Sequence, residues 1–420
     1  MTSWKTYRLG DICNLVAGFA FKSKDFGDHP NKVVKIADIQ PPVVNTNELV
    51  GVDLSNYDTV KLSKYLVSKG DYVLAMTGAT IGKLGRITND IEAYINQRVL
   101  TFRPIESIVD KDYLYYQLCS DKFNKYILNH IDSETAQPNI SAGSVGGFEI
   151  YLPGLEEQRR IAGILGAIDD KIENNRRINT NLELQAQALY KQWFVDFEFP
   201  NEEGKPYKSS GGKMVDSALG LIPDGWSVGK LEDIGDIIGG GTPSKAVAEY
   251  YTKNGIAWIT PKDLSVSHLK FTAKGETDIT ELGYKNSSAK IMPRGSVLFS
   301  SRAPIGYISI AKNDICTNQG FKSVVPNNGC TAFVYYFLLS NTENIESKAT
   351  GSTFKEASGA LMKSLELVIP SEDILEKFEN IMSPIFESQE KFEAENETLA
   401  TLRDTLLPKL MNGEIKISEL

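Results

Sequence analysis

Apolar residues recur at alternating steps of four and three in two long stretches of the chain, which predicts two amphipathic helices. Each stretch covers about 40 residues, or about 60 Å of helix. The second stretch repeats the first at a spacing of 217 residues. The first apolar seam comprises Ile161, Leu165, Ile168, Ile172, Asn175, Asn179, Leu182, Ala186, Leu189 and Trp193, and the second comprises Phe378, Met382, Ile385, Gln389, Phe392, Asn396, Leu399, Arg403, Leu406 and Leu410.

Each helix alone would leave an apolar stripe in water, so we expect the two helices to pair with each other. Polar residues in the middle of both seams, such as Asn175 and Gln389, lower the stability of such a pair but select its register. An antiparallel coiled coil with pseudo-twofold symmetry is the simplest arrangement, because a whole globular segment separates the helices in sequence. A parallel pairing is the alternative.

Short β-rich runs punctuated by Gly and Pro precede each long helix, which indicates globular domains of mixed α/β (α+β) class. Asn96–Pro104 recurs as Asn318–Pro326, and Tyr115-Tyr116 recurs as Tyr335-Tyr336. A repeat with so long a period predicts two tandem pseudo-repeats and not a solenoid. The expected boundaries are 1–153 for the first globular domain, 154–200 for the first helical spacer, 201–222 for a linker, 223–370 for the second domain and 371–420 for the second spacer.

Within the two domains, the same elements are expected at matching places. One helix is predicted in each domain, around Asp112–Leu128 and around Ala332–Ser340. The predicted strands include Lys32–Ile39, Tyr72–Met76 and Gln97–Phe102 in the first domain, and Gly255–Thr260, Ser296–Ser300 and Gly320–Val325 in the second.

The 420 residues carry a formal net charge of −9, most of which lies in residues 371–420. Both globular domains are close to neutral, so the total charge neither excludes nor supports DNA binding. No apolar run reaches the length of a membrane span and the N-terminus has no apolar signal core, so we expect a cytoplasmic protein. Four scattered cysteines favour buried thiols over a metal or redox site.

No catalytic motif is found in the sequence. Gly78–Leu84 resembles a phosphate loop, but it is one residue short and Leu84 has no hydroxyl for magnesium, so a tight turn is expected. Gln40–Val43 differs from the Asn/Asp-Pro-Pro-aromatic loop that positions an amino group for methyl transfer. The sequence therefore predicts a binding scaffold without an active site of its own and without a metal.

Several short motifs, each weak by itself, occur in a fixed order and partly in duplicate. A Trp…Leu-x-Asp-Ile pattern begins at Trp4 and again at Trp226. Gly-Phe-Ala-Phe-Lys-Ser stands at Gly18–Ser23, Gly-Gly-Thr-Pro-Ser-Lys at Gly240–Lys245, and Leu-Pro-Gly-Leu-Glu-Glu-Gln-Arg-Arg-Ile-Ala at Leu152–Ala162. With these motifs the chain resembles, along nearly its whole length, the specificity subunit of Type I restriction–modification systems.

The resemblance implies two target-recognition domains, held apart by antiparallel helical spacers, that each read one half of a bipartite site in double-stranded DNA. It implies that two methyltransferase (modification) subunits dock on the chain, together with restriction/translocase subunits in the full complex. S-adenosylmethionine and ATP are then expected only in these partner subunits, and no cofactor is expected in this chain. A protein–protein adaptor with pseudo-symmetry and without DNA binding is the alternative function.

Reading DNA requires Arg, Lys, Asn or Gln on base edges and Lys, Ser or Thr near phosphates. Such residues lie in Gly-rich turns of both domains, although for each of them a solvated loop side chain is the alternative. Asn96-Gln97 and Asn318-Gln319 occur in both repeats, and we expect their Asn side chains to shape a turn by bonding the backbone. The candidate DNA-binding residues are Lys22, Ser23, Lys24, Thr77, Thr80, Lys83 and Arg98 in the first domain, and Thr242, Ser244, Lys245, Lys262, Arg302, Thr350, Ser352, Thr353 and Lys355 in the second.

Both long helices carry more apolar residues than one seam can bury, among them Ile164, Phe194, Ile374 and Ile381. Two explanations remain open. These residues pack against the globular domains, or they meet helices of the partner methyltransferases in a four-helix arrangement.

Overall fold

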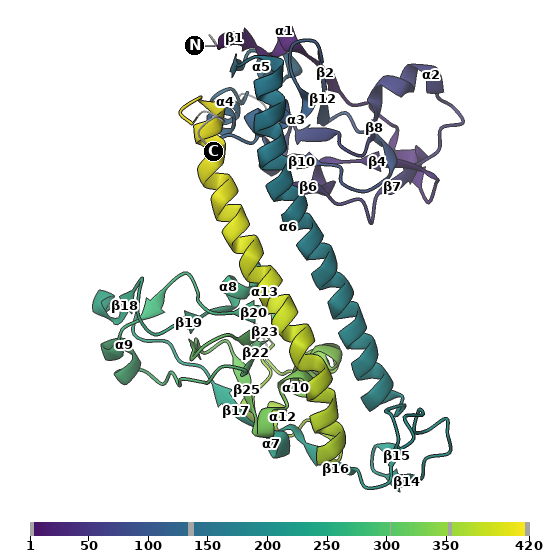
Figure 1. Cartoon of the computed structure of the whole chain (residues 1–420), viewed down its shortest axis with the longest axis vertical. Helices are drawn as coiled ribbons and strands as arrows, with labels where there is room; N and C mark the ends of the chain where they lie inside the picture. The colour runs from purple at the N-terminus through teal and green to yellow at the C-terminus, as the bar shows by residue number, and fades with distance from the viewer. Residues whose placement is uncertain (1–3, 133–137, 303, 352–354, 416–420) are drawn as a thin grey trace. The chain divides into compact units, whose positions relative to one another are not determined.

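A computed structural model of the chain describes residues 4–132, 138–302, 304–351 and 355–415. The chain forms two compact units, unit 1 with residues 1–172 and 398–420, and unit 2 with residues 173–397. Each unit holds one globular part, called head 1 or head 2, and a portion of both long helices, α6 (Leu155–Tyr190) and α13 (Glu372–Met411) (Figure 1). Over the described ranges, no helix is long and apolar enough to cross a membrane.

Head 1 is built on two sheets, with strand orders β2-β12-β9-β10-β6-β5 and β3-β7-β4-β11-β8. β1 pairs antiparallel with β13, the strand that leads into α6. The strands are β1 (Lys5–Arg8), β2 (Cys13–Ala17), β3 (Phe26–Gly27), β4 (Asn31–Val34), β5 (Ile39–Gln40), β6 (Val43–Val44), β7 (Val50–Val52), β8 (Leu66–Ser68), β9 (Tyr72–Ala75), β10 (Leu84–Arg86), β11 (Glu92–Ile95), β12 (Val99–Pro104) and β13 (Glu149–Leu152). The helices are α1 (Leu9–Ile12), α2 (Thr59–Leu62), α3 (Lys111–Leu118), α4 (Asp121–Asn129) and α5 (Ala142–Gly146).

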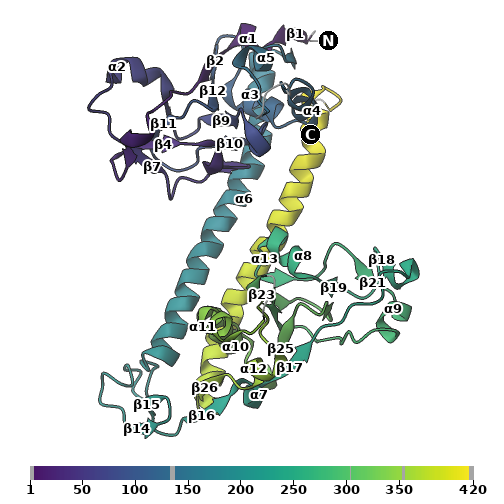
Figure 2. The same cartoon turned by 180° about the vertical axis from the view of Figure 1, so that it is seen from behind.

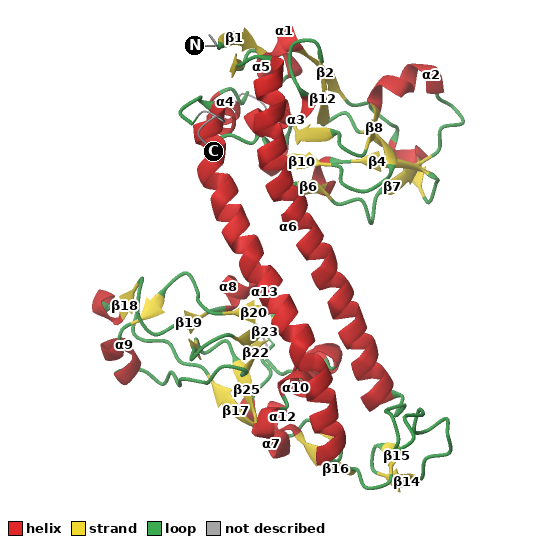
Figure 3. Ribbon diagram, viewed as in Figure 1, coloured by secondary structure: helices red, strands yellow, loops and turns green. Residues whose placement is uncertain are grey.

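Head 2 is built on one five-stranded sheet with order β17-β25-β22-β23-β20 (Figure 3). β16 pairs with β26 ahead of α13 (Figure 2). Its strands are β16 (Ser227–Lys230), β17 (Gly235–Gly239), β18 (Tyr251–Thr252), β19 (Trp258–Ile259), β20 (Phe271–Thr272), β21 (Asp278–Ile279), β22 (Val297–Ser301), β23 (Ile305–Ala311), β24 (Cys316–Thr317), β25 (Lys322–Pro326) and β26 (Glu366–Ile369). Its helices are α7 (Leu231–Ile234), α8 (Pro261–Ser267), α9 (Glu281–Lys285), α10 (Thr331–Ser340), α11 (Thr342–Lys348) and α12 (Gly359–Lys363).

The two heads share one topology. In head 1, β2, β12, β9 and β10 are neighbours in that order and β10 pairs parallel with β6. In head 2, β17, β25, β22 and β23 follow the same order and β23 pairs parallel with β20. The predicted mixed α/β class, the repetition and the two long helices are therefore confirmed. The predicted strands are present with shifted ends, as β4, β9, β12, β19, β22 and β25.

The single helix expected over Asp112–Leu128 is wrong, because the structure has two helices there, α3 and α4. Ser120 separates the two helices by capping the second one. The Oγ atom of Ser120 accepts a hydrogen bond from the backbone N–H of Phe123 at 3.3 Å, which caps the start of α4.

In unit 1, the first half of α6 packs against the end of α13. Ile161 and Leu165 share a buried cluster with Leu410. Further along α6, Asp169 accepts a hydrogen bond from Arg403 at 2.9 Å. The partner of the later α6 residue comes earlier in α13, so the helices are antiparallel within this unit (Figure 2).

In unit 2, the second half of α6 and the turn after it pack antiparallel against the first part of α13. The side chain of Asn175 donates to that of Asn396 at 3.0 Å, and the ring centroids of Trp193 and Phe378 are 5.7 Å apart. The parallel alternative is excluded within both units. Of the apolar seam positions, Ile161, Leu165, Ile168, Ile172, Ala186, Trp193, Phe378, Met382 and Leu410 are buried, and Leu182, Leu189, Ile385, Phe392, Leu399 and Leu406 are partly buried.

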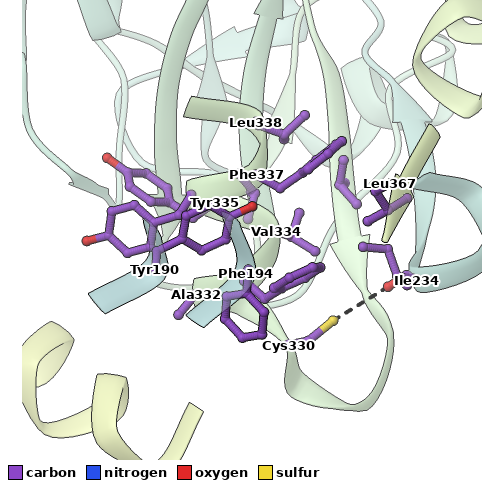
Figure 4. Close-up of a cluster of buried hydrophobic side chains, with 14 of the residues drawn as sticks. Tyr190, Phe194, Ile234, Cys330, Ala332, Val334, Tyr335, Phe337, Leu338 and Leu367 are labelled. Atoms are coloured by element: carbon purple, nitrogen blue, oxygen red, sulfur yellow. Dashed lines mark hydrogen bonds between the residues drawn. The ribbon is translucent and has the colours of Figure 1, made fainter. Parts of the chain in front are cut away.

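The main core of unit 2 joins head 2 to both long helices. Tyr190 at the end of α6 and Phe194 in the π-helical turn that follows, Lys191–Val195, lie in one buried cluster with residues of α10, including Val334 and Leu338 (Figure 4). Ile374 of α13 belongs to the same cluster. Some of the apolar residues beyond the seams therefore pack against a head, as the first explanation predicted.

The segment 201–222 was expected to be a loop, but it contains a β-hairpin. β14 (Met214–Ser217) pairs antiparallel with β15 (Gly220–Pro223). The ring of Phe199 stacks on Tyr207 and on Trp226, with centroids 4.6 and 4.9 Å away. These aromatic contacts hold the connector to the entry of head 2.

Candidate nucleic-acid interface

The same turn precedes β12 in head 1 and β25 in head 2. The side chain of Asn96 accepts a hydrogen bond from the N–H of Gln97 at 2.7 Å, and Asn318 accepts one from Gly320 at 2.8 Å. The prediction that these asparagines shape a turn through the backbone is confirmed. The neighbouring Gln97 and Gln319 side chains are exposed.

A glycine-containing loop crosses each of these turns. A Cβ atom on Gly18 would lie 2.2 Å from the carbonyl O of Asn96, and one on Gly240 would lie 1.9 Å from that of Asn318. No other residue type fits such an approach without a shift of the main chain. The glycines in the two sequence motifs therefore bring the loops after β2 and β17 against the repeated turns.

In head 1, backbone hydrogen bonds connect three of the candidate segments. The N–H of Phe19 donates to Ile95 at 2.9 Å, and the N–H of Met76 donates to Arg98 at 2.9 Å. The turn that carries Arg98 thus lies between the loop with Lys22–Lys24 and the turn with Thr77–Lys83.

The cations of this surface have no carboxylate partner in the described ranges. Lys22, Lys24, Lys83 and Arg98 are exposed, as is Ser23. Thr77 and Thr80 are half-buried, and the hydroxyl of Thr80 donates to the carbonyl of Thr77 at 3.1 Å. The Thr77 hydroxyl is buried without a hydrogen-bond partner among the described residues, so it does not face solvent as the other candidates do.

Head 2 brings its candidate residues around the turn at Asn318. The hydroxyl of Thr242 donates to the side chain of Gln319, and the N–H of Ser301 donates to Gly320 at 2.7 Å. An isolated antiparallel β-bridge joins Arg302 to Glu356. Lys262 is one residue after Pro261, whose ring lies against Gly320.

Carboxylates partly neutralise the cations of head 2. Glu356 lies 3.8 Å from Arg302 and 3.1 Å from Lys322, and Glu276 lies 2.8 Å from Lys262. The remaining candidates Ser244, Lys245, Thr350 and Lys355 are exposed, while Ser352 and Thr353 lie outside the described residues. The cations around the turn of head 1 are therefore unpaired in the described ranges, whereas several around the matching turn of head 2 are paired with carboxylates.

Sequence reasoning missed four residues of these surfaces. Gln97 and Gln319 were grouped with their asparagines, although only the asparagine side chains are used by the turns. The Gln97 side chain is left exposed beside its turn, whereas that of Gln319 accepts the hydroxyl of Thr242. The repetition of Asn-Gln is the signal that could have identified both glutamines. Lys322 and Glu356 gave no comparable signal, because their pairing joins residues 34 apart.

The thiols do not form a reactive site. Cys13, Cys316 and Cys330 are buried, and Cys119 is partly buried. Burial raises the pKa of each of these thiols to about 12. Across the described ranges, no group of three His, Cys, Asp or Glu side chains is arranged to hold a metal ion.

Comparison with known proteins identifies the class. The sequence model of the Type I restriction modification DNA specificity domain matches residues 1–184 and 223–401. A Type I restriction enzyme specificity subunit of Haemophilus influenzae is 27% identical over 99% of this chain and 100% of its own length. A specificity subunit of Methanocaldococcus jannaschii is 39% identical over 44% of each chain.

The fold also occurs among solved structures. The S subunit of a Type I restriction–modification system from M. genitalium superposes with a TM-score of 0.60 at 15% identity, over 97% of this chain and 96% of the other. The chain belongs to the Type I restriction modification DNA specificity family, and it is a DNA sequence-recognition subunit of that class.

Proposed function

We propose that each head reads one half of a bipartite DNA site, through the exposed polar residues around the turns at Asn96 and Asn318. The observation that supports this proposal is that both heads have the same strand order and the same asparagine turn but carry different side chains around that turn. Arg98 in head 1 corresponds in sequence to Gly320 in head 2. Two heads of one fold with different side chains can recognise two unrelated half-sites, because each base pair is recognised by the side chains that match the donors and acceptors on its edge.

The helical portions act as spacers of fixed length between residues 1–153 and 223–370, the two target-recognition domains. The connector 201–222 with its hairpin joins the first spacer to the second domain. The paired spacers restrict the half-sites to one separation and one rotational phase on the duplex, because DNA repeats about every 34 Å.

The spacers also receive two methyltransferase subunits, and the complete assembly adds restriction/translocase subunits. Apolar side chains on the helix surfaces support this part of the proposal. Leu184 and Ile381 of unit 2 are 60% and 42% exposed, and Leu402 of unit 1 is 46% exposed. Catalysis, S-adenosylmethionine and ATP belong to those partners, and the assembly works in the cytoplasm.

Mapping methylated bases in host DNA tests the proposal directly. The genome of a strain that expresses this chain with its methyltransferase should carry methylation at one two-part sequence with a constant gap. A strain that lacks only this chain should lose that methylation. Methylation that persists unchanged without the chain would contradict the proposal.

A further inference from the structure

In each unit, a tyrosine of the head belongs to a hydrogen-bond network that includes both long helices. In unit 1, the hydroxyl of Tyr116 on α3 donates to Asp169 on α6 at 2.7 Å. The other oxygen of Asp169 accepts from Arg403 on α13 at 2.9 Å. Tyr116 is 2% exposed, and the Asp169 and Arg403 side chains are 30% and 25% exposed.

Unit 2 contains the same three chemical groups. The hydroxyl of Tyr336 on α10 lies 3.1 Å from a carboxylate oxygen of Glu183 on α6, and Lys270 lies 2.6 Å from that oxygen. The ammonium of Lys270 also donates to Tyr336 at 2.7 Å and to Gln389 on α13 at 2.9 Å. Its side chain is only 8% exposed, and it lies 4.0 Å from the ring centre of Phe386.

The main chain beside Lys270 is also held by α13. Glu393 accepts the N–H of Lys270 at 3.0 Å and that of Phe271 at 3.2 Å. The segment ahead of β20 is thus fixed to both long helices at once.

The two networks do not arise from repetition alone. Tyr116 and Tyr336 are equivalent in the sequence repeat. The carboxylates and cations are not, since the residue 217 positions after Asp169 is Phe386 and the residue 217 positions before Arg403 is Ala186. Equivalent tyrosines are therefore combined with a carboxylate and a cation that come from different positions in the two units.

A partly buried ion pair that joins three elements contributes little net stability but strongly disfavours other registers, because a shift leaves a charge unpaired. We propose that the networks Tyr116–Asp169–Arg403 and Tyr336–Glu183–Lys270 are positioning sites that fix each head along the paired helices and so restrict the gap between the two half-sites. This inference rests on the proposed function of the heads and spacers.

The test uses the complete chain with its methyltransferase subunits and a set of DNA molecules. Each molecule carries both wild-type half-sites, and the gap between them ranges from two base pairs shorter to two longer than the natural gap. The wild-type complex should methylate one gap length. Lys270→Met and Asp169→Asn should each reduce the preference for that length over its neighbours about tenfold, the loss expected for a hydrogen bond to a charged group. The bases required in each half-site should stay the same.

The double variant Tyr116→Phe and Tyr336→Phe removes only two hydroxyls. It provides a second test of the gap preference if Lys270→Met or Asp169→Asn does not fold. Arg177→Met is the matched control, because Arg177 pairs with Glu173 on the surface of α6 alone, at 3.1 Å. The control should keep the wild-type gap preference, and Lys270→Arg should retain more of it than Lys270→Met. An unchanged gap preference in folded Lys270→Met, Asp169→Asn and the double tyrosine variant would overturn this inference alone. A wild-type complex that methylates no two-part site would overturn the proposed function and this inference with it.

Discussion

At the scale of single residues, Arg98 is the best placed candidate for reading a base in head 1. Its main chain is bonded to Met76 and its side chain is exposed without an ion pair in the described ranges. An arginine held in this way can bond both acceptors of a guanine. Arg98→Ala should therefore cost about 1–3 kcal/mol of discrimination at one base pair of the first half-site.

Methylation rates on DNA molecules with single-base changes measure this effect. Arg159→Ala is the control, because Arg159 is exposed on α6 and, among the described residues, forms an ion pair only with Glu156, at 3.0 Å. The prediction fails if Arg98→Ala alters the bases required in the second half-site, or if the control produces the same relaxation.

A partly buried carboxylate should make unit 2 sensitive to pH. Glu379 of α13 accepts the N–H groups of Ala332 at 3.1 Å and Phe333 at 2.9 Å, at the start of α10. Burial raises the pKa of Glu379 from 4.5 to about 7, and the two hydrogen bonds oppose this shift. The folded state then holds a proton that the unfolded state has lost between these pH values, so stability falls as pH rises from about 4.5 to 7.

Glu379→Gln should flatten this decline by about 1–2 kcal/mol, which is less than the full shift would give because the site is partly open to solvent. Thermal unfolding of the whole chain at several pH values measures it. Burial also raises the pKa of Glu393 to about 7 and lowers that of Lys270 to about 8, so part of the pH dependence should remain. Equal slopes for the variant and the wild type would contradict the assignment.

Residue roles were predictable from sequence only where the chemistry is local. The Asn96 and Asn318 turns involve hydrogen bonds to the next residue or the one after it, so composition and repetition revealed them. Pairing of Arg302 and Lys322 with Glu356 depends on how distant segments meet, and no sequence period encodes it. For the same reason the tyrosine networks were invisible, although the Tyr-Tyr repeats themselves were found.

At the scale of elements, α6 and α13 were the most predictable parts, because their seams repeat every seven residues over most of each helix. The strands of the heads were less predictable from the sequence. Strands such as β19 and β24 contain two residues each and pair in parallel, and such short elements depend on tertiary contacts more than on local pattern. The hairpin β14–β15 lies in a polar, Gly-rich connector whose composition gave no alternating apolar pattern.

The spacer lengths lead to a prediction about phase. Insertion of three heptads after Ile172 in α6 and after Glu397 in α13, where the two units meet in sequence, adds about 31 Å to each helix. This is close to one turn of DNA, so the preferred gap should lengthen by about 9–10 base pairs with both half-sites unchanged. One heptad adds about 10 Å, which leaves the heads out of phase and should lower methylation at every gap.

Sequencing of methylated sites in a plasmid library with variable gaps distinguishes these results. The one-heptad insertion is the control for the disturbance that any insertion causes. The spacer role is wrong if the three-heptad variant keeps the original gap, or if it recognises new half-sites.

At the scale of the whole molecule, the net charge of −9 neither excludes nor supports DNA binding, whereas the distribution of the charges favours a DNA reader over the adaptor. The exposed cations of head 1 lie around one turn, while most of the acidic excess lies in residues 371–420. DNA binding releases counterions in proportion to the phosphates that the protein neutralises. The affinity of the complex with its methyltransferase for a specific duplex should therefore fall at least about 100-fold between 50 and 200 mM salt.

Fluorescence anisotropy with a labelled duplex measures this affinity. Replacement of Lys22, Lys24 and Lys83 with alanine should make the slope of log K against log salt shallower by about one for each phosphate that is no longer neutralised. Neutral replacements of Lys191 and Lys205, which are paired with Asp196 and Glu203 at 2.6 and 2.8 Å, should leave the slope unchanged. An adaptor would give a complex whose DNA affinity is weak, and the replacements in head 1 would not change its dependence on salt. The salt slope therefore tests whether the exposed lysines of head 1 neutralise DNA phosphates, which the total charge does not decide.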